Sequence, residues 1–491
     1  MKVTLISVDQ ELYCIGLRIL SACLHQADHS VQCIFLPPKA TQSAKTKFRM
    51  TYSPELLDEV YSLCLDSDLV GLSLMTNQFT RAVNVTQHLR NRQMDAPIVW
   101  GGVHPTVEPE VCLKHADIVC LGEGENALIE LTDLMERDRP FLDTRNMWFK
   151  TESGIIRNSL RPLVQDLDQF PFPDYSCKDH FIARGDRIEA LTPNGLAQFE
   201  GERFRSEGQA IHYPIMTSRG CPFACTYCCN SVYRRLYPHQ KHLRWRSVDN
   251  VIAELQMIQR QVTSLAFVVM VDDNFTARTE KDLAVFCQRY QTEIGVPFAC
   301  QCSPLTITEE KMDILVSAGC AKVVVGIETA SERVAKMYNR GRFHQAVPDA
   351  ISLVESYRSR MPSPPSYQFI IDNPYETLDE TLETLQLAVS LPRPWDNPIY
   401  SLMLFPGTPL YDQARRDRFV RDKFSQIYGK NWHDQSKPFF RFWIRLYRAN
   451  VSPFLLRILL SAWIARLLTS DLADSVWKMR IFRWLWDTPL Q

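Results

Sequence analysis

Residues 217–230 read TSRGCPFACTYCCN and place Cys221, Cys225 and Cys228 in a C-x3-C-x2-C spacing within one short loop. Three thiolates this close together can hold three irons of a cubane cluster and leave the fourth iron without a protein ligand, whereas ordinary electron-transfer clusters use four cysteines. An open iron can bind a substrate or a cofactor. The stretch therefore predicts a [4Fe-4S] cluster with chemistry at its free iron.

The alternative is a structural zinc site or a group of reduced thiols. A structural zinc ion normally takes four ligands, and the further candidates near the loop are Cys229, His212, His239 and His242. Most of the other cysteines stand in apolar runs, where small buried core residues are expected rather than ligands. No cysteine follows residue 320, which excludes a second cysteine-bound cluster in the C-terminal part. The residues around the loop favour the iron–sulfur cluster.

Arg219 and Gly220 precede the first cysteine, and Tyr227 stands just ahead of the last one. With these neighbours the loop resembles the signature of the radical S-adenosylmethionine superfamily. The resemblance implies that the open iron chelates the amino and carboxylate groups of S-adenosylmethionine, and that the reduced cluster cleaves it to a 5'-deoxyadenosyl radical. It also implies that Tyr227 packs near the adenine.

The chain from Ile215 to about Tyr411 alternates strands and helices, as a partial parallel (β/α)6 TIM-like barrel does. Strands are expected at 265–271, 297–301, 322–327, 366–371 and 398–405. Catalytic groups belong at the carboxyl ends of such strands. The polar and glycine residues there are Asp272, Asp273, Asn274, Gln301, Gly326, Glu328 and Asp372.

Five of these residues become candidates for binding S-adenosylmethionine. By the resemblance, Asp272, Asp273 and Asn274, together with Gly326 and Glu328, lie around its methionine and ribose parts. Carboxylates can accept hydrogen bonds from an ammonium group and from ribose hydroxyls. Alternatively, one of the two aspartates only caps a helix that begins near residue 276 or 279. Residues 404–410, LFPGTPL, also resemble the end of the family's radical module.

The first 135 residues carry short apolar runs at 3–7, 31–36, 69–74, 97–100 and 118–121. Such turn-bounded runs are typical of buried parallel strands, and helical segments such as 16–25 and 80–92 separate them. The pattern predicts a five-stranded, doubly wound, flavodoxin-like (Rossmann-type) domain. Ligands bind beyond the carboxyl ends of the strands in such sheets, and glycines let the backbone approach a large ligand. The candidates there are Ser73, Thr76, Gly101, Gly102, Gly122 and Gly124.

Residues 1–135 resemble the cobalamin-binding domain that precedes the radical module in one branch of the superfamily. Many cobalamin domains carry Asp-x-His-x-x-Gly after the first strand, whereas residues 9–14 read DQELYC and have neither the histidine nor the glycine. Radical enzymes of this branch commonly lack that histidine too. We expect His104 to shape its loop rather than to bind cobalt. A flavodoxin-like domain without cobalamin stays open as an alternative, because a fold does not fix its ligand.

Two regions carry no recognisable chemistry. Residues 136–210 are expected to be a connector with a hairpin at 146–160, and residues 421–491 a helical extension with six of the ten tryptophans. The apolar stretch 455–468 contains Arg457 and Arg466 and is far shorter than the ~20 residues needed to span a bilayer. We expect it to cap the barrel, since its two arginines would project to opposite faces of one helix. A lid or a membrane-surface contact is the less favoured alternative.

Composition indicates an enzyme of a reducing compartment. A formal net charge of −1 over 491 residues gives no general reason to expect a nucleic acid partner. The short apolar run at 1–7 is followed at once by acidic residues and lacks the features of a signal peptide. Fifteen cysteines in such a chain predict a cytoplasmic location.

Taken together, the resemblance implies an enzyme that uses a [4Fe-4S] cluster, S-adenosylmethionine and cobalamin to methylate an unactivated carbon. A small-molecule substrate is expected, of apolar character if the tryptophan-rich tail is a guide, along with an external electron donor such as flavodoxin or ferredoxin. Two alternatives stay open. One is oxidative ring closure or rearrangement without methyl transfer, and the other is a cobalamin-binding sensor with a vestigial barrel.

Overall fold

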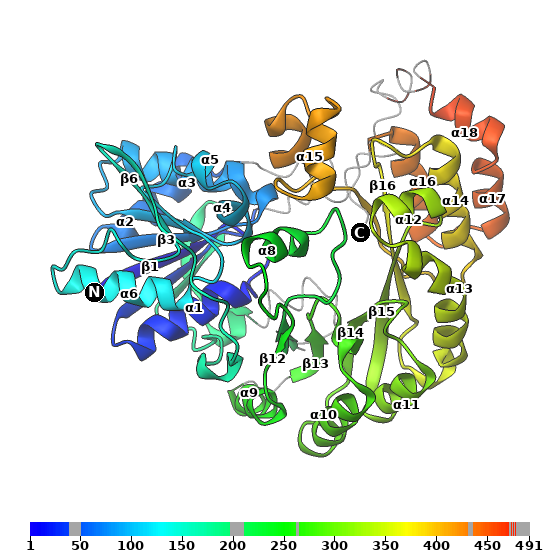
Figure 1. Ribbon diagram of the computed structural model, residues 1–491, viewed down its shortest axis with the longest axis horizontal. Helices are drawn as coiled ribbons and strands as arrows, with labels where there is room; N and C mark the ends of the chain where they lie inside the picture. Colours follow the sequence, from blue (N-terminus) through cyan, green and yellow to red (C-terminus); the bar gives the residue numbers. More distant parts are fainter. Residues whose placement is uncertain are drawn as a thin grey trace.

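The computed structural model describes residues 1–38, 51–196, 211–261, 265–430 and 436–470, together with residues 473, 475 and 477. These residues form an N-terminal layered domain, a curved parallel sheet surrounded by helices, and a group of helices at the C-terminal side (Figure 1). The α/β class, with two parallel sheets and a helical extension, is confirmed.

The N-terminal sheet has the strand order β7-β6-β5-β4-β3-β1-β2-β8-β9. Its centre consists of the five predicted parallel strands, β1 (Lys2–Ser7), β2 (Ser30–Phe35), β3 (Leu69–Ser73), β4 (Ile98–Gly101) and β5 (Ile118–Cys120). Buried apolar clusters lie on both of its faces, as a doubly wound sheet requires. The surrounding helices are α1 (Ile15–Gln26), α2 (Pro54–Cys64), α3 (Phe79–Asn91), α4 (Val103–Val107), α5 (Pro109–Cys112) and α6 (Glu125–Glu136).

The prediction of five strands was incomplete, because residues expected to be a connector extend this sheet at both edges. The hairpin β6 (Met147–Thr151) and β7 (Gly154–Arg157) pairs antiparallel with β5, whereas β8 (His180–Arg184) pairs parallel with β2 and antiparallel with β9 (Arg187–Ala190). An open sheet leaves backbone hydrogen-bonding groups unpaired along its edge strands. The two hairpins satisfy those groups.

The second sheet contains six parallel strands in chain order, so each strand neighbours the next one along the chain. They are β10 (Ile211–Ile215), β13 (Leu265–Met270), β14 (Phe298–Cys302), β15 (Cys320–Glu328), β16 (Ser366–Ile371) and β17 (Ile399–Ser401). The first and last strands do not pair with each other, which leaves the barrel open. The outer helices are α9 (Val248–Gln261), α10 (Glu280–Glu293), α11 (Glu309–Ser317), α13 (Gly341–Ser356) and α14 (Leu378–Ser390).

The helical extension predicted at 421–491 begins with a π-helix, Phe424–Tyr428, whose Ile427 and Tyr428 pack in an apolar cluster of the N-terminal domain. Helix α16 (Pro438–Arg448) follows and packs on the barrel as expected. Its side chains Phe439, Trp443 and Tyr447 are almost fully buried in the core cluster of the barrel. The expectation of one helix over 455–468 was wrong, because α17 (Pro453–Leu459) and α18 (Ala462–Leu468) are separate short helices. Three of the six late tryptophans lie outside the described residues, namely Trp432, Trp484 and Trp486.

Arg457 and Arg466 stand on these two separate helices and not on opposite faces of one. The directions of these two arginines therefore give no reason against a membrane contact. Within the described part of the chain, no helix is both long and apolar enough to span a membrane.

Candidate cofactor-binding site

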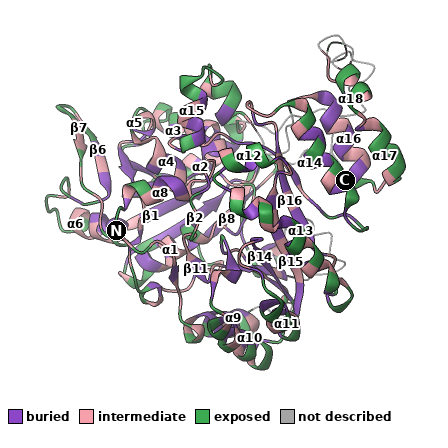
Figure 2. Ribbon diagram, turned by 45° about the vertical axis from the view of Figure 1, so that its right-hand side comes forward, coloured by how far each residue is buried: buried purple, intermediate pink, exposed green. Residues whose placement is uncertain are grey.

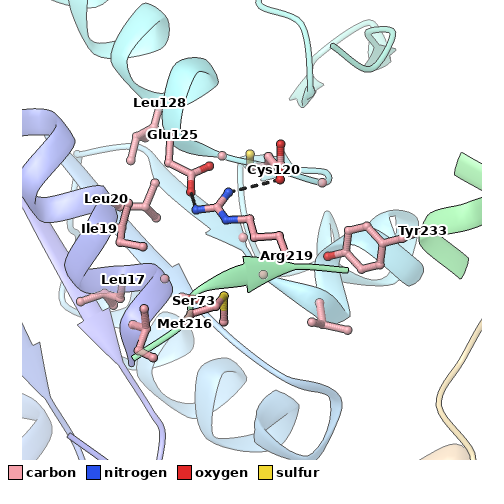
Figure 3. Close-up of a pocket in the computed structure, with 18 of the residues that line it drawn as sticks. Leu17, Ile19, Leu20, Ser73, Cys120, Glu125, Leu128, Met216, Arg219 and Tyr233 are labelled. Atoms are coloured by element: carbon pink, nitrogen blue, oxygen red, sulfur yellow. Dashed lines mark hydrogen bonds and ion pairs between the residues drawn. The ribbon is translucent and has the colours of Figure 1, made fainter. Parts of the chain in front are cut away.

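A cavity of about 400 Å³ lies between the carboxyl edge of the N-terminal sheet and the first strands of the barrel. From the N-terminal domain it is lined by five of the six predicted ligand-binding residues, Ser73, Gly101, Gly102, Gly122 and Gly124. From the barrel side it is lined by Ser218, Arg219, Gly220, Asn230 and Asp273, among others. Figure 3 shows Arg219, Met216 and Tyr233 on this side. The structure therefore brings candidate residues of both domains to one cavity.

Thr76, the sixth predicted residue of the N-terminal domain, does not line this cavity. Its side chain is fully buried, and its hydroxyl lies 3.2 Å from Nδ1 of His104. Burial lowers the pKa of His104 to about 3, so the imidazole is neutral. His104 packs edge-on against Phe79 beneath the loop and is not among the lining residues. This placement agrees with a role in shaping the loop.

Two glycines leave space for a ligand on this side of the cavity. Gly102 has a φ of +98°, and a Cβ atom there would lie 2.9 Å from the carbonyl oxygen of Leu74. Gly71 stands within β3, where a Cβ atom would lie 2.9 Å from Cδ2 of Leu5. A glycine inside a strand often marks a place where a ligand approaches the backbone closely. The space beside these two glycines, which we call the glycine cradle, therefore suits one part of a large ligand such as cobalamin.

The cysteine loop begins after the short strand β11 (Ser218–Arg219), which pairs antiparallel with β12 (Arg244–Trp245). Gly220 has a φ of +83°, and a Cβ atom there would lie 2.4 Å from the carbonyl oxygen of His242. A side chain would therefore collide with backbone, which explains the glycine before the first cysteine. The loop ends at helix α8 (Asn230–Leu236).

Hydrogen bonds to backbone groups of the loop hold it against two distant segments. The backbone amide of Thr226 donates to the carbonyl of Tyr338 at 3.1 Å, and the side chain of Asn339 donates to the carbonyl of Ala224 at 3.0 Å. The amide of Leu410 donates to the carbonyl of Thr226 at 3.0 Å. Residues 404–410, singled out by sequence, thus help to fix the loop.

Two side chains donate to cysteine sulfurs of the loop. Arg340 Nη1 lies 3.5 Å from Cys225 Sγ, and Asn230 Nδ2 lies 3.7 Å from Cys228 Sγ. Burial raises the pKa of Cys221 to about 12 and also raises that of Cys225. A cysteine sulfur binds metal as the thiolate, so these thiols must lose their protons when a metal binds. Metal binding supplies the free energy for that loss.

The geometry does not favour a zinc ion at these cysteines. Zinc–sulfur bonds of about 2.3 Å require ligand atoms within about 4.6 Å of one another. Among the described residues, one set of three possible ligands meets a limit of 4.8 Å, and it consists of His29, Asp133 and Glu136. The sulfurs of the three loop cysteines do not all lie within that limit of one another, so they do not form a ready-made three-ligand zinc site.

The three polar residues after β13 have different surroundings. Asp273 lines the cavity, accepts a hydrogen bond from Asn230 at 2.9 Å, and has a pKa raised by burial. Asp272 is buried and accepts hydrogen bonds from Thr217 and Ser218. Asn274 is buried as well, and its amide donates to a serine that follows β14. Asp273 is therefore the member of this group that faces the cavity.

The alternative role of the aspartates as helix caps was wrong. Helix α10 is capped by Thr279, whose Oγ1 accepts a hydrogen bond from the backbone amide of Asp282 at 3.1 Å. The short 3-10 turn Phe275–Ala277 has no side-chain cap.

Gly326, Glu328 and Tyr227 gather around Arg340, which the sequence did not single out. The Arg340 guanidinium donates to the carbonyl of Gly326 at 2.6 Å and lies 3.9 Å from Oε1 of Glu328. Burial raises the pKa of Glu328. The ring of Tyr227 packs edge-on against Tyr338 at 4.9 Å. A Cβ atom at Gly326 would lie 2.6 Å from Oε1 of Glu328, so the glycine makes room for that carboxylate.

Largely buried ion pairs join the two domains beside the cavity. Arg219 pairs with Glu125 at 2.5 Å (Figure 3). Arg219 also pairs with Glu123 at 3.2 Å, and Arg244 pairs with Glu123 at 2.8 Å. Burial by itself raises the pKa of Glu123, but the hydrogen bond from Arg244 and the charge of Arg219 outweigh it and keep the pKa below its usual value. The residues before the first cysteine are thus bound directly to the loop after β5.

Family comparisons agree with this arrangement. A family model of the B12 binding domain matches residues 1–132, and one of the radical SAM superfamily matches residues 215–388. The chain thus combines a B12 binding domain with a domain of the radical SAM superfamily, the pair of domains that defines the cobalamin-dependent radical S-adenosylmethionine enzymes. Its cofactors are a [4Fe-4S] cluster, S-adenosylmethionine and cobalamin. The sensor alternative is thereby set aside, because the chain is an enzyme.

Two curated relatives of this radical enzyme illustrate the range of reactions in the family. An uncharacterized methyltransferase of Pyrococcus horikoshii is 28% identical over 71% of this chain and 70% of its own length. The anaerobic magnesium-protoporphyrin IX monomethyl ester cyclase of Rubrivivax gelatinosus is 23% identical over 71% of this chain and 58% of its own length.

Among solved structures, the radical S-adenosylmethionine methyltransferase TsrM from Kitasatospora setae, with cobalamin and a [4Fe-4S] cluster bound, resembles the enzyme in fold. The TM-score is 0.62 at 18% identity, and the similarity covers 85% of this chain and 78% of the other.

Proposed function

We propose that this enzyme transfers a methyl group to an unactivated carbon of a small molecule. One observation carries the proposal: a single cavity is lined both by the glycine loops of the cobalamin-binding domain and by residues that flank the cysteine loop. Methyl transfer of this kind needs the two cofactors near each other. When bound, they supply radical formation from S-adenosylmethionine and carriage of the methyl group.

The protein's own contribution is to hold these groups in place. Cys221, Cys225 and Cys228 would bind three irons and leave the fourth open. Arg340 presents a buried guanidinium that can pair with the carboxylate of S-adenosylmethionine. Glu328 and Asp273 can accept hydrogen bonds from its ammonium group or its ribose hydroxyls.

On the other side of the cavity, the loops with Gly101, Gly102, Gly122 and Gly124 would lie against cobalamin, with the Ser73 hydroxyl as a donor. The ion pairs of Arg219 would keep these loops at a fixed distance from the cysteine loop.

We assign the electron supply to an external donor such as flavodoxin or ferredoxin, and the location to the cytoplasm. All fifteen cysteines are free, which agrees with a reducing compartment.

The test measures the products formed from S-adenosylmethionine by the reduced enzyme, reconstituted anaerobically with iron, sulfide and cobalamin. Methyl transfer predicts S-adenosylhomocysteine and 5'-deoxyadenosine together, because one molecule donates methyl and a second is cleaved. Deoxyadenosine without S-adenosylhomocysteine would instead support ring closure, as the similarity to the Rubrivivax cyclase allows. Neither product from enzyme with a full cluster, in the presence of candidate substrates, would refute the proposal.

The cluster assignment has its own test. Replacing Cys221, Cys225 or Cys228 by alanine should abolish both the cluster and deoxyadenosine formation. The matched control is Cys229→Ala, next to the last ligand, which should retain iron, sulfide and activity. Deoxyadenosine from any of the three variants would contradict the assignment of that cysteine.

A further inference from the structure

The two short helices α17 and α18 carry large apolar side chains on their outer surface. Their exposed fractions are 71% for Phe454, 51% for Leu455, 40% for Ile458, 69% for Trp463 and 62% for Leu467. We call these five residues the C-terminal apolar patch. Both helices lie at the edge of the molecule that is farthest from the N-terminal domain (Figure 1). Clusters of exposed apolar side chains usually mark interaction sites.

The patch is not needed to pack these helices on the barrel. Their inner faces already do so through Leu456, Leu460 and Ala465, which are fully buried in the barrel's core cluster. Figure 2 accordingly shows exposed and buried colours side by side along the same short helices. The five patch residues lie on the opposite, outer side, so apolar side chains cover both faces of α17 and α18.

Every charged side chain between residues 436 and 470 is positive. Residues 436–470 contain one lysine, five arginines and neither aspartate nor glutamate, whereas the whole chain has a formal net charge of −1. Arg457 and Arg466 are exposed and alternate with the patch residues along α17 and α18. Arg466 pairs with Asp379 of α14 at 3.0 Å, on the exposed surface.

We propose that the C-terminal apolar patch docks on an anionic membrane surface. Aromatic and aliphatic side chains of such a face enter the boundary between headgroups and acyl chains, and arginines meet the lipid phosphates. The contact is peripheral, since no helix of the described residues could span a bilayer.

A second copy of the chain fits this surface less well. A two-fold symmetric contact would place the same helices on both sides, so Arg457 and Arg466 of one copy would approach the same arginines of the other. An anionic bilayer supplies the opposite charge together with an apolar layer.

The test is flotation of the full-length protein with vesicles, which needs no catalytic activity. Vesicles of phosphatidylcholine with about a third phosphatidylglycerol should bind the protein, added salt should weaken binding, and pure phosphatidylcholine should bind much less. The double substitution Trp463→Ser with Leu467→Ser should lower the partition coefficient about tenfold or more. Arg457→Gln should lower it about fivefold, and only at low salt.

The matched control is Leu65→Ser, because Leu65 is 61% exposed at the end of α2 in the other domain. It should leave vesicle binding unchanged. Equal binding to neutral and anionic vesicles, or unchanged binding of the double variant, would overturn the proposal. So would a dimer in sedimentation that the double substitution dissociates, since the patch would then be a protein interface. Arg457→Gln provides a second test should the double variant not fold.

Discussion

Arg340 donates a hydrogen bond to the sulfur of Cys225 at 3.5 Å, although 115 residues separate them. The same guanidinium donates to the carbonyl of Gly326 and stacks over the ring of Phe343 at 4.0 Å. These contacts fix its direction. Hydrogen bonds to cluster sulfurs set the reduction potential of iron–sulfur centres, so Arg340 links the strand end of β15 to the redox chemistry.

Arg340→Met should therefore assemble a full cluster with a more negative reduction potential. The donor and the positive charge both stabilise the reduced, more anionic cluster, and both are removed. Loss of such a supporting contact typically costs 10- to 100-fold in activity. Redox titration followed by electron paramagnetic resonance measures the potential, with deoxyadenosine formation as the second readout.

The control for this change is Arg342→Met, two residues further along and on the exposed side of α13. It should leave both potential and rate unchanged. An unaltered potential in Arg340→Met would show that Arg340 does not tune the cluster.

Glu123 should contribute to stability through its buried ion pairs with Arg219 and Arg244. Removing one partner of a buried pair costs on the order of 3 kcal/mol, so Glu123→Gln should lower the free energy of unfolding at pH 7 by about that much. Because the folded pKa of Glu123 lies below its usual value of 4.5, this contribution is present above about pH 4.5 and is lost as pH falls through the folded pKa. Denaturant unfolding of wild type and variant at pH 7 and at pH 4 measures it.

Glu110→Gln serves as the control, since Glu110 pairs with Arg157 at 2.8 Å on the surface and is 63% exposed. Surface pairs contribute about 0–1 kcal/mol. Equal losses in the two variants at pH 7 would contradict a special role for the interdomain pairs.

Much of the fold follows from the sequence because the central strands are short apolar runs bounded by turns. The run 69–74 matches β3, and 366–371 matches β16 to the residue. The hairpin expected at 146–160 is formed by β6 and β7, although its pairing with the first sheet was not expected. The hairpin of β8 and β9 was missed, since β9 is mostly exposed and lacks a clear pattern. The single helix expected at 455–468 failed because the uniform apolar composition hides the break between α17 and α18.

The candidate site, too, could be predicted from the sequence only in part. The cysteine loop and the glycine loops could be predicted because spacing and composition carry their chemistry. Arg340 and Glu123 could not, since an arginine or a glutamate in a polar stretch has no distinctive pattern. Glu123 and Glu125 did lie inside the GEGE segment that marks a strand end, but their partners come from the other domain. Thr76 was selected for its hydroxyl, yet the turn after β3 directs it to His104.

Gly102 should be irreplaceable at the cavity. Its positive φ of 98° and the 2.9 Å approach to the Leu74 carbonyl leave no room for a methyl group. Gly102→Ala should lose about 1–3 kcal/mol of stability and retain less cobalamin, measured by thermal unfolding and by the absorbance of bound corrin. Gly341→Ala, at the start of α13, meets only the flexible side chain of Lys336 at 3.4 Å and should be neutral or slightly stabilising. Full cobalamin retention by Gly102→Ala would contradict the prediction that the glycine cradle holds cobalamin.

Glu376 should make stability fall as pH rises. Both of its carboxylate oxygens are buried without a hydrogen-bond partner, and burial, aided by the charges of Glu380 and Asp372, raises its pKa to about 8. The folded protein therefore holds a proton that the unfolded chain releases near pH 4.5, so stability is lost between about pH 4.5 and pH 8 by a few kcal/mol. Glu376→Gln keeps the shape of the neutral acid and removes this loss.

The melting temperatures of wild type and Glu376→Gln should then be similar at pH 5, whereas at pH 9 the variant should melt higher. Glu332→Gln is the control, because Glu332 is 60% exposed in an ion pair with Lys336 on α12 (Glu332–Met337). Its difference from wild type should stay small over the same range. Parallel melting curves for wild type and Glu376→Gln from pH 5 to pH 9 would show that Glu376 is ionised in the folded enzyme, and that a partner for its charge lies within reach.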